Sequence, residues 1–287
     1  MIVSSRSRKK HDFSSVINAF FARSALMVFT FAAASPAAAS GGLAIWGWNF
    51  YGQLGNGGFT NSSVPIEAVT SGVLAGKTIT RIAGGGAHTC VVTSDDGVYC
   101  WGANFNGQLG NGVIGGFSSL PTTVNISGAL AGKTVSQITA GGNSTCALAS
   151  GRAYCWGWGG AGELGNGGYA DSSVPVAVTT SGVLAGKTVT QIAGGYHHNC
   201  AVTSDGGAYC WGFNSYGQLG NGGNSISNVP VAVTTNGVLA GKTVSQIEGG
   251  EGHTCAVTSD GGAYCWGDGG GVSSATAEPQ IQTCLSP

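Results

Sequence analysis

The dipeptide Trp-Gly recurs along the chain at a constant interval of 55 residues. It stands at Trp46, Trp101, Trp156, Trp211 and Trp266. A version of the sequence GQLGNG follows the first four copies, and after each of these comes a proline at Pro65, Pro121, Pro175 or Pro230. Self-similarity at a fixed period of this length is typical of repeat architectures, so we interpret the chain as tandem copies of one small unit.

The third copy shows what one unit contains. Residues 174–180, 188–195, 198–204 and 208–212 are short segments rich in Val, Thr, Ile and Tyr, and turn signals separate them. Segments this short and close together leave no room for a helix and predict a four-stranded antiparallel sheet. Repeated sheets of this kind are the blades of a β-propeller.

The repeat count predicts an all-β propeller with an incomplete blade. Four complete units cover 64–102, 120–157, 174–212 and 229–267. A lone strand is expected near each chain end, at Leu43–Gly47 and at Glu278–Thr283. We expect these two strands to pair as a partial fifth blade; the alternative is an open arc from a truncated chain.

The first 39 residues differ from the rest and predict a signal peptide. A basic stretch precedes the apolar run ALMVFTFAAA, and Ala37-Ala38-Ala39 fits an A-x-A cleavage site. An uncleaved anchor is the alternative. Residues 40–287, the expected propeller domain, keep six Lys and Arg against eleven Asp and Glu, a formal charge of −5. This charge argues against nucleic acid or a membrane as partner of the secreted chain.

Eight of the nine cysteines form one couple in each unit. The couples are Cys90 and Cys100, Cys146 and Cys155, Cys200 and Cys210, and Cys255 and Cys265. Each couple flanks an expected hairpin turn, and directly opposed strand residues have the separation that a disulfide requires. We therefore predict four cross-strand disulfides and an oxidising compartment. The spacing does not fit a zinc site, and no metal or other cofactor is expected.

The segment GVLAGKT at Gly72–Thr78 returns at Gly182–Thr188 and Gly237–Thr243, and as GALAGKT at Gly128–Thr134. It looks like a phosphate-binding loop but has one residue too few between its glycines. The segment after it is an expected strand, whereas a phosphate loop leads into a helix N-terminus. We interpret it as a connector between strands, and no nucleotide is expected.

The composite repeat QIAGGxHxCAVTSDGxAYCWGxNxxGQLGNG resembles the repeat of the regulator of chromosome condensation family. The resemblance covers about residues 43–267 and is closest to secreted bacterial members with paired cysteines. It implies a propeller, which in this family usually has seven blades. The nucleotide exchange known in the family is a poor expectation here, because the chain is acidic and short of blades.

The alternation of strand direction separates the loops of the propeller onto two faces. One face carries nearly identical connectors and turns; the other carries loops that vary between copies and hold aromatic residues. Varied loops on a rigid scaffold suit a binding surface. We predict binding residues Trp48, Tyr51, Trp158, Tyr196, His197, Phe213 and Tyr216, and we interpret Phe50 and Phe105 as packing between blades.

Catalytic groups are weak in this sequence. His88, His198 and His253 share one repeat position and are interpreted as structural, and Glu251 with His253 lacks a nucleophile. The leading hypothesis is a secreted, non-catalytic propeller that binds an extracellular macromolecule, preferably a protein. The alternatives are a carbohydrate or cell-wall binding module and an exported lyase or hydrolase.

Overall fold

A computed structural model of the chain describes residues 42–269 and 282–283, and the expected signal peptide and Cys284 lie outside these residues. The described strands form one two-stranded sheet and four four-stranded antiparallel sheets, here called the first to fourth blades. The two-stranded sheet contains β1 (Ala44–Gly47) and β2 (Ser62–Glu67). The first blade contains β3 (Ile79–Gly84), β4 (His88–Thr93), β5 (Val98–Ala103) and β6 (Phe117–Thr123). The second contains β7 (Val135–Ala140), β8 (Ser144–Ala149), β9 (Arg152–Gly157) and β10 (Ser172–Ala177). The third contains β11 (Val189–Gly194), β12 (His198–Thr203), β13 (Ala208–Gly212) and β14 (Ser227–Ala232). The fourth contains β15 (Val244–Gly249), β16 (His253–Thr258), β17 (Ala263–Gly267) and β18 (Gln282–Thr283).

The four-stranded blades are confirmed, but their strands are grouped differently from the sequence units. The strand that opens each expected unit pairs with the last strand of the unit before it, so β6 pairs with β5 and β10 pairs with β9. Each blade therefore takes its outermost strand from the following repeat. This exchange ties neighbouring repeats together by backbone hydrogen bonds.

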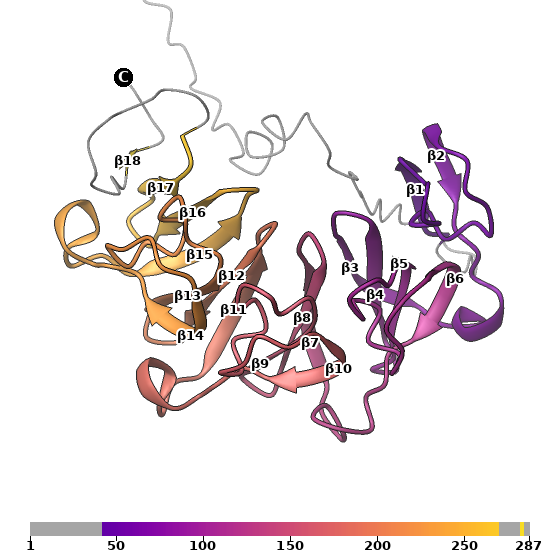
Figure 1. Ribbon diagram of the computed structural model, residues 1–287, viewed down its shortest axis with the longest axis horizontal. Coiled ribbons are helices and arrows are strands. Elements are labelled where there is room, and N and C mark those ends of the chain that lie inside the picture. The colour runs from indigo at the N-terminus through magenta and orange to yellow at the C-terminus, as the bar shows by residue number, and fades with distance from the viewer. Residues whose placement is uncertain (1–41, 270–281, 284–287) are drawn as a thin grey trace, which may run out of the picture.

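The expected partial fifth blade from the two chain ends is wrong. β1 pairs with β2, which follows it along the chain, and β18 pairs with β17 to complete the fourth blade. Figure 1 shows the described sheets in an arc, with β1 and β2 at one end and the fourth blade at the other. The open arc named as the alternative describes this arrangement.

The predicted cysteine couples are confirmed as disulfides within the blades. Cys90 lies directly opposite Cys100, and the other three couples are opposed in the same register. The four Cα–Cα distances are 4.0–4.1 Å. The shorter second couple is accommodated by a two-residue turn, in which Ser150 and Gly151 both have positive φ.

The hydrophobic core lies between blades rather than inside them. Each of its four clusters combines side chains of two neighbouring sheets, as where Cys146 and Leu148 of the second blade pack with Ile192 and Trp211 of the third. On the inner edge of the arc, the side-chain amide of Gln137 brackets the backbone of Ile192. It donates to the Ile192 carbonyl at 2.8 Å and accepts from its N–H at 2.9 Å.

Candidate binding face

The loops sort onto two faces as predicted. The connector before β7 and the turn after β4 meet where Thr134 donates a hydrogen bond to Asp96. On the opposite side, the loop after β9 meets the β11–β12 loop where the rings of Trp158 and His197 are 4.7 Å apart. We call the side formed by 48–61, 85–87, 104–116, 141–143, 158–171, 195–197, 213–226 and 250–252 the variable face, and the other side the repeated face.

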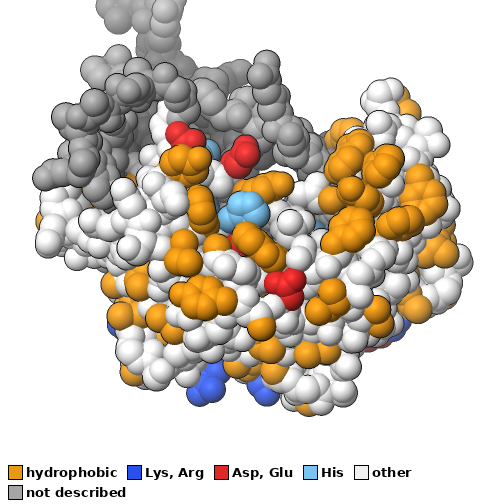
Figure 2. Space-filling model, viewed as in Figure 1, with side chains coloured by type: hydrophobic (Ala, Val, Ile, Leu, Met, Phe, Trp, Pro, Cys, Tyr) orange, Lys and Arg blue, Asp and Glu red, His pale blue; other side chains and the backbone are white. Residues whose placement is uncertain are grey.

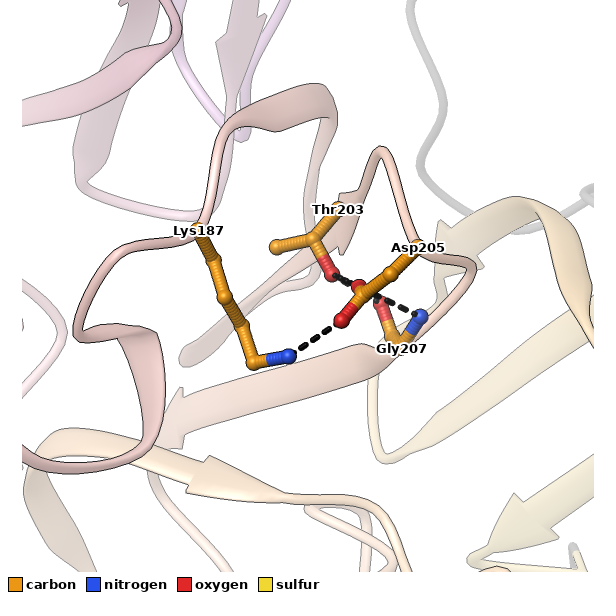
Figure 3. A network of polar contacts seen from close by, with 4 residues as sticks. All are labelled: Lys187, Thr203, Asp205 and Gly207. Carbon is orange, nitrogen blue, oxygen red and sulfur yellow. Dashed lines mark hydrogen bonds and ion pairs between the residues drawn. The ribbon is translucent and has the colours of Figure 1, made fainter.

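The repeated face explains the segment GVLAGKT. Its Gly-Val-Leu forms a 3-10 turn, η1 (Gly72–Leu74), η2 (Gly182–Leu184) or η3 (Gly237–Leu239), and the next element is a strand, as expected. The leucine is buried in the core, whereas Val73, Val183 and Val238 are exposed. Figure 3 shows the lysine of the third connector, Lys187, paired with Asp205, which also accepts hydrogen bonds from Thr203 and Gly207.

The same ion pair recurs between Lys77 and Asp95 and between Lys242 and Asp260. The hydrogen bonds from Lys77 and Thr93 lower the pKa of Asp95 to about 2. Each of these three lysines thus has an acidic partner on the repeated face and holds its connector against the neighbouring hairpin turn.

The GQLGNG sequence fastens each blade to the next on the variable face. The backbone carbonyl of Gln108 accepts a 3.0 Å hydrogen bond from the indole N–H of Trp156 and a 2.8 Å bond from Thr145. Gly110 lies against the same indole, where an added Cβ would come within 2.6 Å of Nε1. The repeated Trp-Gly and GQLGNG motifs are therefore two halves of one contact between blades.

Two of the repeated histidines strengthen these junctions. Because Thr145 gives its only hydroxyl proton to Gln108, Nε2 of His88 must donate to Thr145 across their 2.8 Å contact. Full burial lowers the pKa of His88 to about 4, so the ring is neutral at pH 7. His198 repeats the arrangement with Thr254. The structural interpretation of these two histidines agrees with these contacts.

The predicted binding residues gather into two patches on the variable face. Trp48 and Tyr51 belong to the first aromatic patch, which also contains Phe50, Phe59, Phe105 and Phe117. Phe50 and Phe105, expected to pack between blades, are instead 63% and 49% exposed, although Phe105 also contacts the ring of Tyr51 from the preceding repeat. Phe59 and Phe117 were missed, since both lie in stretches without a repeated motif.

The second aromatic patch consists of Trp158, Tyr196, His197, Phe213 and Tyr216. His197 is at its centre, with ring centroids 4.7 Å from Trp158, 4.5 Å from Tyr196 and 6.2 Å from Phe213. Tyr196 and Tyr216 are exposed. Figure 2 shows hydrophobic side chains in two groups on the viewed side, one around a histidine, with acidic side chains nearby and Lys and Arg only at the lower margin.

A buried carboxylate lies beneath the second patch. Glu163 takes the place of the Gln of the other three GQLGNG copies and is 1% exposed. Its Oε2 accepts a 2.9 Å hydrogen bond from the Ala161 N–H. Its Oε1 has no hydrogen-bond partner and lies 3.7 Å from Nδ1 of His197, which has none either.

Burial sets the titration of both groups. It raises the pKa of Glu163 to about 7, with a smaller contribution from the charge of Asp171 and against the backbone hydrogen bonds from Glu163 and Ala161. Burial also lowers the pKa of His197, an effect that the nearby Glu251 opposes. The expected couple of Glu251 and His253 is not joined by a hydrogen bond or ion pair within residues 42–269.

The part of the chain that the structure describes contains no group of three or more His, Cys, Asp or Glu side chains placed to hold a metal ion. None of its helices has the length and apolar character needed to cross a membrane.

Four-stranded antiparallel blades, joined by a tryptophan and a glycine-rich loop, define a repeat β-propeller. The profile of the regulator of chromosome condensation (RCC1) repeat matches residues 40–92, 95–148, 150–202 and 205–257. The chain belongs to the RCC1 repeat family.

Known proteins of this family cover much of the chain. The ultraviolet-B receptor UVR8 of Arabidopsis thaliana is 37% identical over 225 residues, which are 77% of this chain and 48% of UVR8. The E3 ubiquitin-protein ligase HERC2 of Homo sapiens is 32% identical over 227 residues, 78% of this chain and 4% of HERC2. The chain thus spans about half of UVR8 and a small part of HERC2.

Solved structures agree with this assignment. Human WBSCR16 matches with a TM-score of 0.70 and 27% identity, over 83% of this chain and 60% of that chain. Prp20p from Saccharomyces cerevisiae matches with a TM-score of 0.65 and 26% identity, over 78% of this chain and 52% of Prp20p. The resemblance to the family is confirmed, while the secreted bacterial type stays a prediction.

Proposed function

We propose that this chain is a secreted, non-catalytic propeller that binds an extracellular protein through the aromatic patches of its variable face. The observation that carries the proposal is the exposure of two aromatic groups on one side of a scaffold whose other side is repetitive. Trp48 is 49% exposed and Phe50 is 63% exposed, although both are large apolar side chains. Exposed aromatic patches of this kind mark interaction sites.

Protein binding is also supported by the family. Yeast RCC1 (Prp20), to which the chain is similar, has been crystallised with Kap60 bound. The rings in both patches are held edge to face by their neighbours, as where Tyr51 packs against Phe105 at 5.2 Å. Such preorganised aromatic side chains provide contact area at a low cost in conformational entropy. Secretion is supported by the predicted signal peptide and by the four disulfides.

The test is affinity capture from culture medium with the immobilised, oxidised chain. The wild type should retain a protein that the double variant Trp48→Ala/Trp158→Ala does not retain. The matched control is Asp205→Asn, which alters the repeated face and should retain the same protein. If the wild type retains no protein but binds insoluble peptidoglycan or a glycan array, carbohydrate binding replaces the proposal.

A further inference from the structure

The junction between the second and third blades differs from the junctions on either side of it. Where the others have His, Thr and Gln, this junction has Ser144, Asn199 and Glu163. The loop before Glu163 also carries Gly159 in place of the asparagine found at Asn49, Asn104 and Asn214. Asn199 donates to the Glu163 carbonyl at 2.9 Å, so the backbone contact between blades is preserved while the side chains have changed.

The fold does not require a charge at Glu163. The Gln of the other copies makes the same bond to the backbone N–H two residues before it, as Gln108 does with Asn106 at 2.9 Å. A neutral amide therefore serves this fold, and Glu163 differs from it in being able to ionise. An unpaired buried charge is costly, and Oε1 of Glu163 has no partner to offset that cost.

The surroundings of this carboxylate fit a cation. Oε1 of Glu163 is directed at His197, and burial of that ring favours its neutral form, so an ionised Glu163 has no positive partner there. Trp158, Tyr196 and Phe213 surround the same histidine, and the faces of such rings attract Lys and Arg side chains. Glu251 is exposed in the loop after β15, on the same face.

Within residues 42–269, no Lys or Arg side chain forms an ion pair with Glu163. The lysines of this range that form ion pairs, Lys77, Lys187 and Lys242, all contact aspartates of the repeated face. Low-dielectric surroundings strengthen the field of a buried charge at the nearby surface. The second aromatic patch is therefore apolar at its rim and negative at its centre.

We propose that the second aromatic patch binds a basic side chain, lysine or arginine, of the partner protein, and that the buried carboxylate of Glu163 supplies the charge that attracts it. This inference rests on the proposed function and names the chemistry of the partner. The aromatic rings contact the aliphatic stem and the cationic head, while Glu163 and Glu251 favour a positive over a neutral side chain.

The test uses two small probes on the oxidised full chain at pH 8, above the raised pKa of Glu163. Nα-acetyl-arginine amide carries the charge, and Nα-acetyl-citrulline amide is its uncharged isostere. Binding is followed by the indole N–H signal of Trp158 in nuclear magnetic resonance spectra, assigned by its loss in Trp158→Phe. We expect saturable binding of the arginine probe, and binding of the citrulline probe that is weaker by about tenfold.

Two charge variants identify the source of the preference. Glu163→Gln places the residue of the other repeats at this position, so it should fold, and it should weaken arginine binding by about fivefold without changing citrulline binding. Glu67→Gln removes one exposed negative charge from β2 and should bind as the wild type does. Equal binding of the two probes, no shift with the arginine probe, or unchanged arginine binding by Glu163→Gln would overturn the proposal.

The cation-binding inference can fail while the proposed protein-binding function holds, and two variants distinguish these outcomes. If Trp158→Ala abolishes capture of the partner protein but Glu163→Gln captures it fully, the aromatic patch binds a protein without a cation. In that case the proposed function stands and this inference falls.

Discussion

Oε1 of Glu163 lies 3.7 Å from Nδ1 of His197, and neither atom has a hydrogen-bond partner. The carboxylate comes from the loop that fastens the second blade to the third, and the imidazole comes from the β11–β12 loop of the third blade. The two loops thus bring an acid and a base together in the middle of an aromatic patch.

This relationship predicts a stability gain for Glu163→Gln that depends on pH. The pKa of Glu163 is raised from 4.5 to about 7, so the folded protein keeps a proton that the unfolded chain releases between these values. Stability due to this group therefore falls as pH rises from about 4.5 to 7 and then levels off. The free energy of unfolding of Glu163→Gln should be close to that of the wild type at pH 4 and higher by up to about 3 kcal/mol at pH 8.

Urea unfolding of both proteins at pH 4 and pH 8 measures this difference. Asp171 faces Glu163, and Glu251 and His198 lie near His197, but all three are common to both proteins. Glu67→Gln serves as the control for removing a negative charge and should show no pH-dependent gain. A gain for Glu163→Gln that is the same at both pH values would contradict the account.

The contact between Gly165 and Trp211 predicts that this glycine tolerates no side chain. Gly165 has a φ of +61°, and an added Cβ would come within 2.8 Å of Nε1 and Cδ1 of Trp211. Gly165→Ala should lower the free energy of unfolding by about 1–2 kcal/mol through the strained backbone and by about 1–3 kcal/mol more through the clash with the indole.

Gly186→Ala is the matched control for this prediction. Gly186 has a φ of +71° but no atom within 4 Å of an added Cβ. Gly186→Ala should therefore lower the free energy of unfolding only through the strained backbone, by about 1–2 kcal/mol. Equal losses of the free energy of unfolding in the two variants would show that the glycine-to-indole contact does not limit this position.

The disulfides predict a modest loss of stability when any one is removed. Each closes a short loop, since the paired cysteines are nine or ten residues apart. Cys200→Ala/Cys210→Ala should lower the free energy of unfolding by about 2–3 kcal/mol. Non-reducing peptide mapping should find only the pairs 90–100, 146–155, 200–210 and 255–265 among these eight cysteines, and pairs between blades would refute the hairpin arrangement.

The sequence was sufficient for the repeat, the blades and the disulfides because each depends on local spacing. Trp101, Trp156 and Trp211 follow one another at 55-residue intervals along the sequence, and Cys146 and Cys155 flank one tight turn. Which four strands form one blade was not predicted correctly, because a periodic sequence can be divided into repeats at any point. The strand pairings in the structure, such as that of β6 with β5, show that the outermost strand comes from the next repeat.

The candidate site was predictable in part. Trp158, Tyr196, His197, Phe213 and Tyr216 were proposed separately from variable loops, and the structure brings them into one patch. Glu163 was missed, although it is the one acidic residue among four copies of GQLGNG. Its contact with His197 joins loops of different blades, and no spacing along the chain indicates that contact.

The central claim is that the variable face is the binding face, and hydroxyl-radical footprinting of the captured complex tests it most directly. Trp48, Trp158, Tyr196 and Phe213 should lose reactivity when the partner is bound, whereas the exposed Val183 and Val238 of the repeated face should not. Protection of these two valines, with the aromatic patches still reactive, would contradict the account.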